Sequence, residues 1–269
     1  MTELKLDRTA LIDADVIAYQ MAARAHSHQD DVMEMTENIK ALLHDWTSRA
    51  FCSDAIILLS CSREDNFRKE WWPLYKEHRT ADPPAMLDTA KQVLWDTASK
   101  KLKMNRLEAD DLMGILATNG KIGNPVIVSI DKDMRQIPGW NFNPNKEDFP
   151  VFISEEQADF LFYQQWLTGD STDGFGGIKG LGPAKAKKLL KPFAVGDELR
   201  LDTSAAHHDI QSMIAEQYAK AGKGKKVKEI NEYMLGMARC ARILRADDFD
   251  SEKKAVIPWT PTVIVAEEG

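Results

Sequence analysis

The chain has 269 residues, of which 43% are hydrophobic, so it is long enough to bury a core in one large domain or in a domain with an appendage. Its 35 Lys and Arg residues against 42 Asp and Glu residues give a net charge of −7. This net charge does not indicate a nucleic-acid-binding protein, although local clusters of positive charge can still bind nucleic acid.

Three cysteines without a CxxC pair argue against a disulfide framework or a zinc site. The N-terminus meets acids before any long apolar run, unlike a signal peptide, and no apolar run is long enough to span a membrane. These features predict a cytoplasmic protein with no membrane partner.

Apolar runs alternate with helix-like segments along the first half of the chain. The runs TALID (9–13), DAIILLS (54–60) and NPVIVSID (124–131) are typical of buried strands, and helices are expected around 32–50 and 109–118. This alternation predicts an α/β fold with a central, mostly parallel sheet. The segment from about 63 to 105 is too long for a simple crossover, and Asp82-Pro83-Pro84 interrupts it. We expect it to form a separate structure above the sheet.

The second half of the chain is predicted to be mostly helical. A helix is expected over 155–167, a glycine-rich run over 168–182, a helix that begins at Pro183 and another near 229–245. We divide the chain into a core with its insert, residues 1–165, and a helical region with a C-terminal extension packed on the core, residues 166–269.

Acidic residues gather where the predicted strands end. Asp13 closes the first strand and Asp15 follows it, while Asp131 and Asp133 close the third. Because the carboxyl ends of parallel strands meet at one edge of a sheet, both DxD pairs are expected to lie close together. The segment RLEADD, with Glu108, Asp110 and Asp111, opens the helix before the third strand and can reach the same edge.

This clustering indicates a metal site. Asp170 and Asp173 add a fourth group of acids, in the glycine-rich run. So many carboxylates would not all stay ionised without cations, and hard oxygen ligands suit Mg²⁺ or Mn²⁺. Two such ions can activate water and stabilise a leaving oxygen in phosphodiester cleavage. A single DxD pair is more often a turn or a cap, but four clusters are much harder to explain in that way.

Two basic segments are candidates for nucleic-acid binding. NFRKEWWPLYKEHR interleaves Arg68, Lys69, Lys76 and Arg79 with aromatic residues, which can stack on bases while the cations hold phosphates. An amphipathic helix with its aromatics in the core is the alternative for Trp71 and Trp72.

In GGIKGLGPAKAKK, Gly180 and Gly182 allow close approach to a phosphate, the next helix directs free N–H groups at it, and Lys179 and Lys185 add charge. Such binding contacts only the backbone and ignores base sequence. The lysines of AKAGKGKKVKE are expected in a solvated loop, with phosphate contact as the less favoured alternative.

Four motifs, by their order and spacing together, resemble the 5′-nuclease, or flap endonuclease, superfamily, and most of all the 5′-to-3′ exonucleases of short-tailed phages. These motifs are LIDADVIAYQ, NFRKEWWPLYKEHR, LEADD followed by SIDKD, and TGDSTDGFGGIKGLGPAKA. The resemblance covers most of the chain, from LIDAD to MARCARILR. It implies a PIN-like nuclease core, a helical arch over the site, and a C-terminal helical DNA-binding region of the helix-three-turn-helix type.

The resemblance also implies roles for individual residues. Tyr75 matches the residue that stacks on the terminal base, Lys76 and Arg79 match the basic pair over the scissile phosphate, and the Gly180–Gly182 turn is where a monovalent cation is expected. The matching metal-site carboxylates are Asp13, Glu108, Asp110, Asp111, Asp131, Asp133, Asp170 and Asp173.

One acid of the family is missing. Where an Asp usually follows the second strand, this chain has Ser60 and Cys61, with Glu64 and Asp65 a little later. Either a neighbouring acid substitutes for it, or the first metal has fewer direct ligands.

The expected function is a 5′-to-3′ exonuclease that uses two Mg²⁺ or Mn²⁺ ions. It would act as a monomer on duplex DNA with a 5′ end, nick or flap, and on RNA–DNA hybrids, in phage replication and recombination. Phage replication proteins are the expected partners and the host cytoplasm the expected location. The alternatives are a catalytically silent relative that binds branched DNA, motivated by the missing acid, and a PIN-type ribonuclease, against which the glycine-rich turn and the long insert argue.

Overall fold

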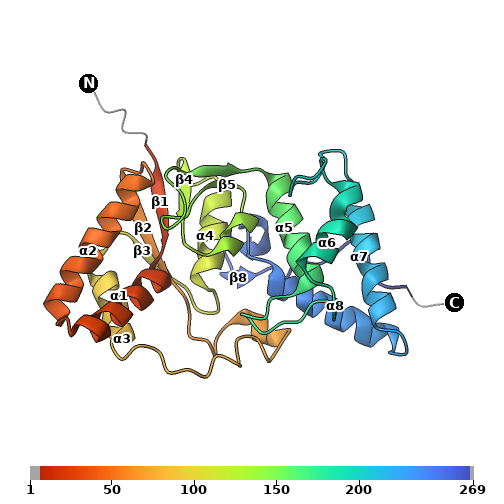
Figure 1. Ribbon diagram of the computed structural model, residues 1–269, viewed down its shortest axis with the longest axis horizontal. Coiled ribbons are helices and arrows are strands. Elements are labelled where there is room, and N and C mark those ends of the chain that lie inside the picture. The colour runs from red at the N-terminus through yellow and green to blue at the C-terminus, as the bar shows by residue number, and fades with distance from the viewer. Residues whose placement is uncertain (1–6, 267–269) are drawn as a thin grey trace.

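A six-stranded sheet forms the centre of the computed structural model, which describes residues 7–266 (Figure 1). The strands follow the order β3-β2-β1-β4-β5-β6 across the sheet, and all neighbours are parallel except β5 and β6. The expected α/β fold with a mostly parallel sheet is confirmed. The strands are β1 (Thr9–Asp13), β2 (Asp54–Leu59), β3 (Lys101–Lys103), β4 (Pro125–Val128), β5 (Gly139–Phe142) and β6 (Val151–Ile153), with a separate hairpin of β7 (Phe249–Asp250) and β8 (Ala255–Val256).

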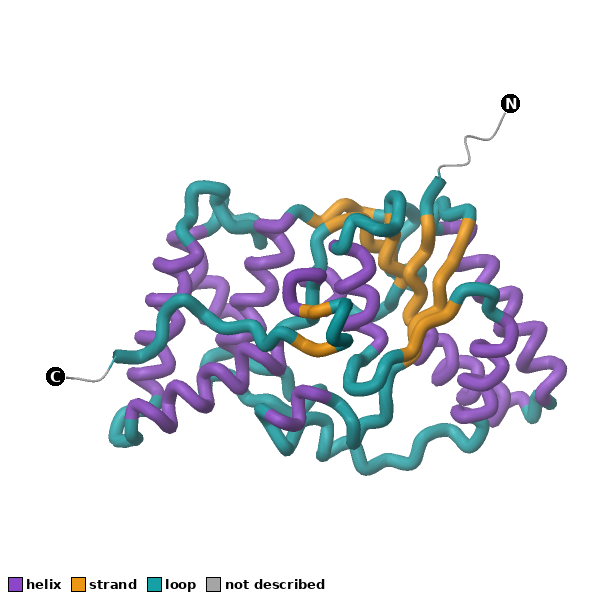
Figure 2. Tube along the Cα trace, turned by 180° about the vertical axis from the view of Figure 1, so that it is seen from behind, coloured by secondary structure: helices purple, strands orange, loops and turns teal. Residues whose placement is uncertain are grey.

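Helices cover both faces of the sheet and build a second region beside it (Figures 1 and 2). The expected helices are present, although the last one lies over residues 227–241 rather than 229–245; α1, α3 and α7 were not predicted. The helices are α1 (Ala14–His28), α2 (Val32–Arg49), α3 (Leu87–Thr97), α4 (Ala109–Thr118), α5 (Glu155–Thr168), α6 (Pro183–Leu190), α7 (His207–Ala221) and α8 (Val227–Ala241).

Alternating side chains in the strands produce the two packed layers. In β1, Ala10 and Ile12 are buried in one cluster with α1, α2 and α3, whereas Leu11 is buried in another with α4. Because successive strand residues point to opposite faces, an uninterrupted apolar run such as TALID is what a strand covered on both faces requires.

Only part of the predicted insert is separate from the core. Ala90 and Leu94 of α3 are fully buried in the cluster with α1 and α2, and β3 pairs with β2 in the sheet. Residues 71–86, which we name the cleft strap, contain turns but no α-helix, and Figure 1 shows them as a loop that passes below the sheet. The expected helical arch is therefore absent here. Three prolines in the strap lack the N–H donors that a helix interior needs.

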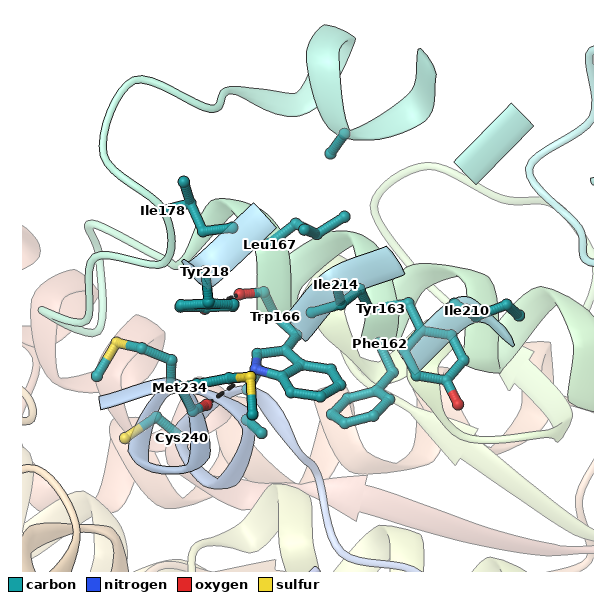
Figure 3. Packing of buried hydrophobic residues seen from close by; sticks show 14 of the residues in the cluster. Phe162, Tyr163, Trp166, Leu167, Ile178, Ile210, Ile214, Tyr218, Met234 and Cys240 are labelled. Carbon is teal, nitrogen blue, oxygen red and sulfur yellow. Dashed lines mark hydrogen bonds between the residues drawn. The ribbon is translucent and has the colours of Figure 1, made fainter. Parts of the chain in front are cut away.

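The helical region has its own core around Trp166 of α5 (Figure 3). The Trp166 indole donates to the backbone carbonyl of Met234 in α8 (2.9 Å), and the Tyr218 hydroxyl of α7 donates to the carbonyl of Trp166 (2.7 Å). Since α5 runs unbroken across residues 165 and 166, we propose a boundary before α5 rather than after residue 165. Beyond α8, Leu244 packs in the cluster that contains α4.

The described part of the chain, residues 7–266, includes no helix that is both long and apolar enough to cross a membrane. The prediction about the N-terminal sequence falls mainly on residues 1–6, which lie outside the described residues.

We predict that Trp166→Ala destabilises the protein by about 3–5 kcal/mol, because it leaves a large cavity in the helical core and removes the hydrogen bond from the indole to the Met234 carbonyl. Chemical denaturation followed by circular dichroism measures this loss. The control is Phe149→Ala, at a residue that is 67% exposed, for which we expect a change within about 0.5 kcal/mol. Equal losses in both variants would contradict the prediction.

Candidate active site

The acids of the core meet because β1, β2 and β4 are parallel and end at one edge of the sheet. Asp13 ends β1 and caps α1, accepting from the N–H of Val16 (3.2 Å). Asp131 follows β4 and caps a short 3-10 helix, accepting from the N–H of Asp133 (2.9 Å). Glu108 caps α4 from the same side. Helix capping thus fixes the positions of these carboxylates.

A cleft of about 1000 Å³ lies at this edge, between the core and the helical region. Seven of the eight predicted metal-site carboxylates line it, and Asp15 lines it as well. The seven are Asp13, Glu108, Asp110, Asp131, Asp133, Asp170 and Asp173. Residues that are up to 160 positions apart in the sequence therefore face one space.

The glycine-rich loop brings Asp170 and Asp173 to the cleft. Gly169 and Gly177 both have positive φ (69° and 55°), and a Cβ on Gly169 would lie 2.4 Å from the backbone nitrogen of Gly177. Asp170 and Phe175 exchange backbone hydrogen bonds of 2.8 and 3.1 Å inside the loop. Only glycine permits this closure, which holds both acids at the end of α5.

The cleft strap places two cations among the acids. The Lys76 ammonium lies 2.6 Å from Glu108 Oε1, and the Arg79 guanidinium lies 2.7 Å from Asp173 Oδ1. The backbone N–H of Lys76 also donates to the backbone carbonyl of Asp173 (2.8 Å). The strap is thus tied to the glycine-rich loop by both its backbone and its side chains.

Two predicted functional residues form a buried ion pair instead. Arg68 is 2% exposed, so it cannot reach DNA, and its guanidinium forms two hydrogen bonds of 2.8 Å with the carboxylate of Asp111. Asp111 is fully buried and does not line the cleft. The structure therefore gives Arg68 and Asp111 an architectural role rather than the predicted DNA-binding and metal-binding roles.

Tyr75 also differs from its predicted role. It is 2% exposed, and its hydroxyl lies 3.0 Å from Glu108 Oε2 and 2.9 Å from Asp173 Oδ2. A ring in this position orients the two acids and has no free face for a terminal base. Lys69 is half-buried and pairs with Glu77 on the same segment.

The predicted DNA-binding turn lies outside the cleft, at the start of α6. Lys179, Gly180, Gly182 and Lys185 are all exposed, and Gly180 has a φ of 78° that favours glycine. The Lys185 ammonium donates to the Gly180 carbonyl (2.9 Å), so a side chain of the protein already contacts the carbonyl that a monovalent cation would use.

Two polar residues that the sequence prediction missed hold the acids in place. The Gln165 amide donates to Asp133 Oδ2 (3.0 Å) and to Asp170 Oδ2 (3.2 Å), which joins the core acids to those of the glycine-rich loop. The Ser129 hydroxyl donates to Asp13 Oδ2 (3.0 Å). The sequence signal for Gln165 is its place in the aromatic segment FLFYQQWL, as a polar residue five positions before Asp170.

The electrostatics of the cleft show an excess of negative charge. Burial and the charge of Asp15 raise the pKa of Asp13 to about 7. Burial and the charge of Asp131 likewise raise the pKa of Asp133 to about 7. Burial and Asp13 raise the pKa of Asp110 well above its usual range. Burial alone would also raise the pKa of Glu108, but Lys76 and Arg68 lower it to about 2. Of these four acids, Glu108 alone has a lowered pKa, because two protein cations lie beside it.

This donor set fits hard divalent cations. The cleft offers carboxylate oxygens, and the pKa values of Asp13 and Asp133 are raised to about 7, so a cation beside them would favour their ionised form. Within residues 7–266, however, no three Asp, Glu, His or Cys side chains are arranged to hold an ion as they stand. Lys76 and Arg79 pair with two of the acids, Glu108 and Asp173, so a cation bound there would compete with these side chains.

Comparison with known proteins identifies the family. The model described as 5′-3′ exonuclease, N-terminal resolvase-like domain, matches residues 8–149. The exonuclease of Escherichia phage T7 is 27% identical over 237 residues, which are 80% of this chain and 77% of that relative.

Two solved structures share the fold. The T5 5′-exonuclease with bound divalent metal ions (zinc) has a TM-score of 0.55 at 13% identity, over 87% of this chain and 100% of that one. The bacteriophage T5 flap endonuclease, in a pseudo-enzyme-product complex with DNA and metal ions, has a TM-score of 0.54 at 14% identity, over 87% of this chain and 99% of that one. Since the family model matches more than half of its length, the chain belongs to the 5′-3′ exonuclease family within the flap endonuclease superfamily.

Proposed function

We propose that the protein is a divalent-metal-dependent 5′-to-3′ exonuclease that hydrolyses phosphodiester bonds of DNA at a 5′ end, nick or flap. The observation that carries this proposal is the cleft in which acids of the sheet edge, of α4 and of the glycine-rich loop face two cations of the strap. The sequence resemblance extends the proposal to RNA–DNA hybrids and to phage replication and recombination.

We assign Mg²⁺ or Mn²⁺, two ions, to the cleft. Asp13, Glu108 and Asp110 would hold one ion, and Asp133, Asp170 and Asp173 the other, with Asp131 beside both groups. When bound, the ions supply an activated nucleophile and neutralise charge at the leaving oxygen. Gln165 keeps the second group together, because its amide bonds both Asp133 and Asp170.

Lys76 and Arg79 of the strap are proposed to have one role before metal binds and another after it. Without metal, Lys76 and Arg79 offset the charge of Glu108 and Asp173. Once metal neutralises these acids, both side chains are free to contact the scissile phosphate, where they stabilise developing negative charge. In this proposal the strap serves as the arch of the family, although it is not helical.

The turn at Gly180 and Gly182 is proposed to bind the duplex away from the cleft, as the helical DNA-binding motif. The turn is exposed, α6 begins at Pro183, and Lys179 and Lys185 lie beside the turn, where their charges can meet a phosphate. A monovalent cation would replace the Lys185 ammonium at the Gly180 carbonyl.

We expect 5′-labelled duplex DNA to lose labelled nucleotides in Mg²⁺, and chelation of the metal to stop this release. Asp133→Asn removes one negative donor without changing side-chain size, and we expect it to lower the rate at least on the order of 100-fold. The control is Asp148→Asn, an exposed acid that does not line the cleft, which should retain full activity. DNA binding without cleavage by the wild-type protein would instead favour the catalytically silent alternative.

Metal should stabilise the folded protein, since it neutralises clustered acids. At 100 times the dissociation constant the gain is about 2.7 kcal/mol, or a rise in Tm of roughly 5–10 °C for a chain of this size. Thermal melts with Mn²⁺ or with chelator measure it. The rise should shrink in Asp133→Asn and persist in Asp148→Asn, and an equal rise in both variants would place the metal elsewhere.

The double variant Lys179→Gln/Lys185→Gln should bind duplex DNA more weakly and with less dependence on salt. Each lost phosphate contact reduces the steepness of the fall of log K, the association constant, with log salt concentration by about 0.9. Fluorescence anisotropy in the inactive Asp133→Asn background measures this slope. Lys100→Gln/Lys121→Gln is the control, because these exposed lysines precede β3 and β4, at the amino ends of these strands. Identical slopes for the two double variants would exclude the turn as a phosphate site.

A further inference from the structure

The acid that the family usually has after β2 is not supplied by the residues that follow this strand. Ser60 and Cys61 stand there, and the next acids, Glu64 and Asp65, are exposed and do not line the cleft. The Asp65 carboxylate accepts from the Ser62 hydroxyl (2.7 Å) in a surface turn. A substitute must therefore come from another element.

Asp15, in the first turn of α1, reaches this position from the neighbouring strand end. Its Oδ2 accepts from the N–H of Ser60 (2.7 Å), so the carboxylate lies directly at the end of β2. Asp15 also lines the cleft. After burial, its charge is the largest cause of the raised pKa of Asp13.

The second oxygen of Asp15 is directed at a cation. Oδ1 is buried and has no hydrogen-bond partner in the described residues, yet the Lys91 ammonium of α3 lies 2.7 Å away. The contact is thus an ion pair without the geometry of a hydrogen bond. A buried carboxylate oxygen in this state needs a positive charge beside it.

We propose that Asp15 supplies the carboxylate of the first metal site that the family otherwise places after β2, and that Lys91 is the counter-ion which holds this carboxylate when no metal is bound. The inference rests on the metal-dependent function proposed above and names a further residue of that site. The Ser60 N–H anchors Oδ2, which leaves Oδ1 for the cation.

A purely structural role for Asp15 makes a different prediction. An acid in a first turn stabilises the helix dipole, and its contact with the Ser60 N–H helps to hold β2. Asp15→Asn retains an acceptor for that N–H and removes only the charge. If the role is structural, this variant should bind metal like the wild type.

The test is calorimetric titration of the full chain with Mn²⁺ in the absence of DNA, with circular dichroism as the check on folding. We expect Asp15→Asn to weaken the first binding event at least about tenfold. Asp88→Asn, which removes an exposed acid from the first turn of α3, is the matched control and should leave the affinity unchanged. Equal affinities for Asp15→Asn and the wild type would overturn the inference.

Two further variants keep the test decisive. Cys61→Asp in the Asp15→Asn background returns an acid to the family position and should restore most of the lost affinity; no recovery would show that the two positions do not serve the same ion. Lys91→Gln should tighten Mn²⁺ binding severalfold, because the competing ammonium is gone, and it remains informative if Asp15→Asn folds poorly. Unchanged affinity in Lys91→Gln would also count against the proposal.

Failure of this inference can be told apart from failure of the proposed function. If the wild-type protein itself takes up no Mn²⁺, the metal-dependent function is wrong and the inference falls with it. If the wild type binds Mn²⁺ and the Asp15 and Lys91 variants bind it equally well, only the assignment of Asp15 is wrong.

Discussion

The buried pair between Arg68 and Asp111 joins three distant parts of the chain. Asp111 belongs to α4, and it accepts from the N–H groups of Glu108 and Leu244 (3.2 Å each). Arg68 lies just before the strap, and it donates to the carbonyls of Cys240 (3.2 Å) and Arg242 (2.8 Å) at the end of α8. Removing one partner of such a pair typically costs about 3–5 kcal/mol, because it leaves an uncompensated buried charge. The strap, the cap of α4 and the C-terminal region all take their positions from this contact.

The carboxylates that line the cleft repel one another, and the protein offsets part of this repulsion with its own cations. Lys76, Arg79 and Lys91 each lie within hydrogen-bonding distance of an acid that lines the cleft. These cations come from the strap and from α3, the helix that follows it. In the proposed function, divalent metal competes directly with these cations, which would link metal binding to the position of the strap. In this proposal the strap side chains become available to a phosphate only after metal has replaced them at the acids.

Much of the fold and part of the site could be predicted from local patterns. Buried strands covered on both faces give continuous apolar runs, and Asp13 and Asp131 could be placed at one sheet edge because parallel strands end together. The roles of Arg68 and Tyr75 could not be predicted in this way. A basic or aromatic residue in an exposed-looking motif has the same sequence signature whether it meets DNA or a buried carboxylate. Gln165 was missed because its partners, Asp133 and Asp170, lie on separate elements.

By itself, the sequence determined the three central strands β1, β2 and β4, the chemistry of the carboxylates and the glycines that let the loop around Asp170 close. These depend on side-chain periodicity and local backbone freedom, which act over a few residues. Only the tertiary structure decided which acids face the cleft and which, like Asp111, are neutralised by a buried guanidinium. It also brought Asp15 of α1 to the end of β2, beside Ser60. A carboxylate's partner is set by distances across the fold, and sequence spacing does not record those distances.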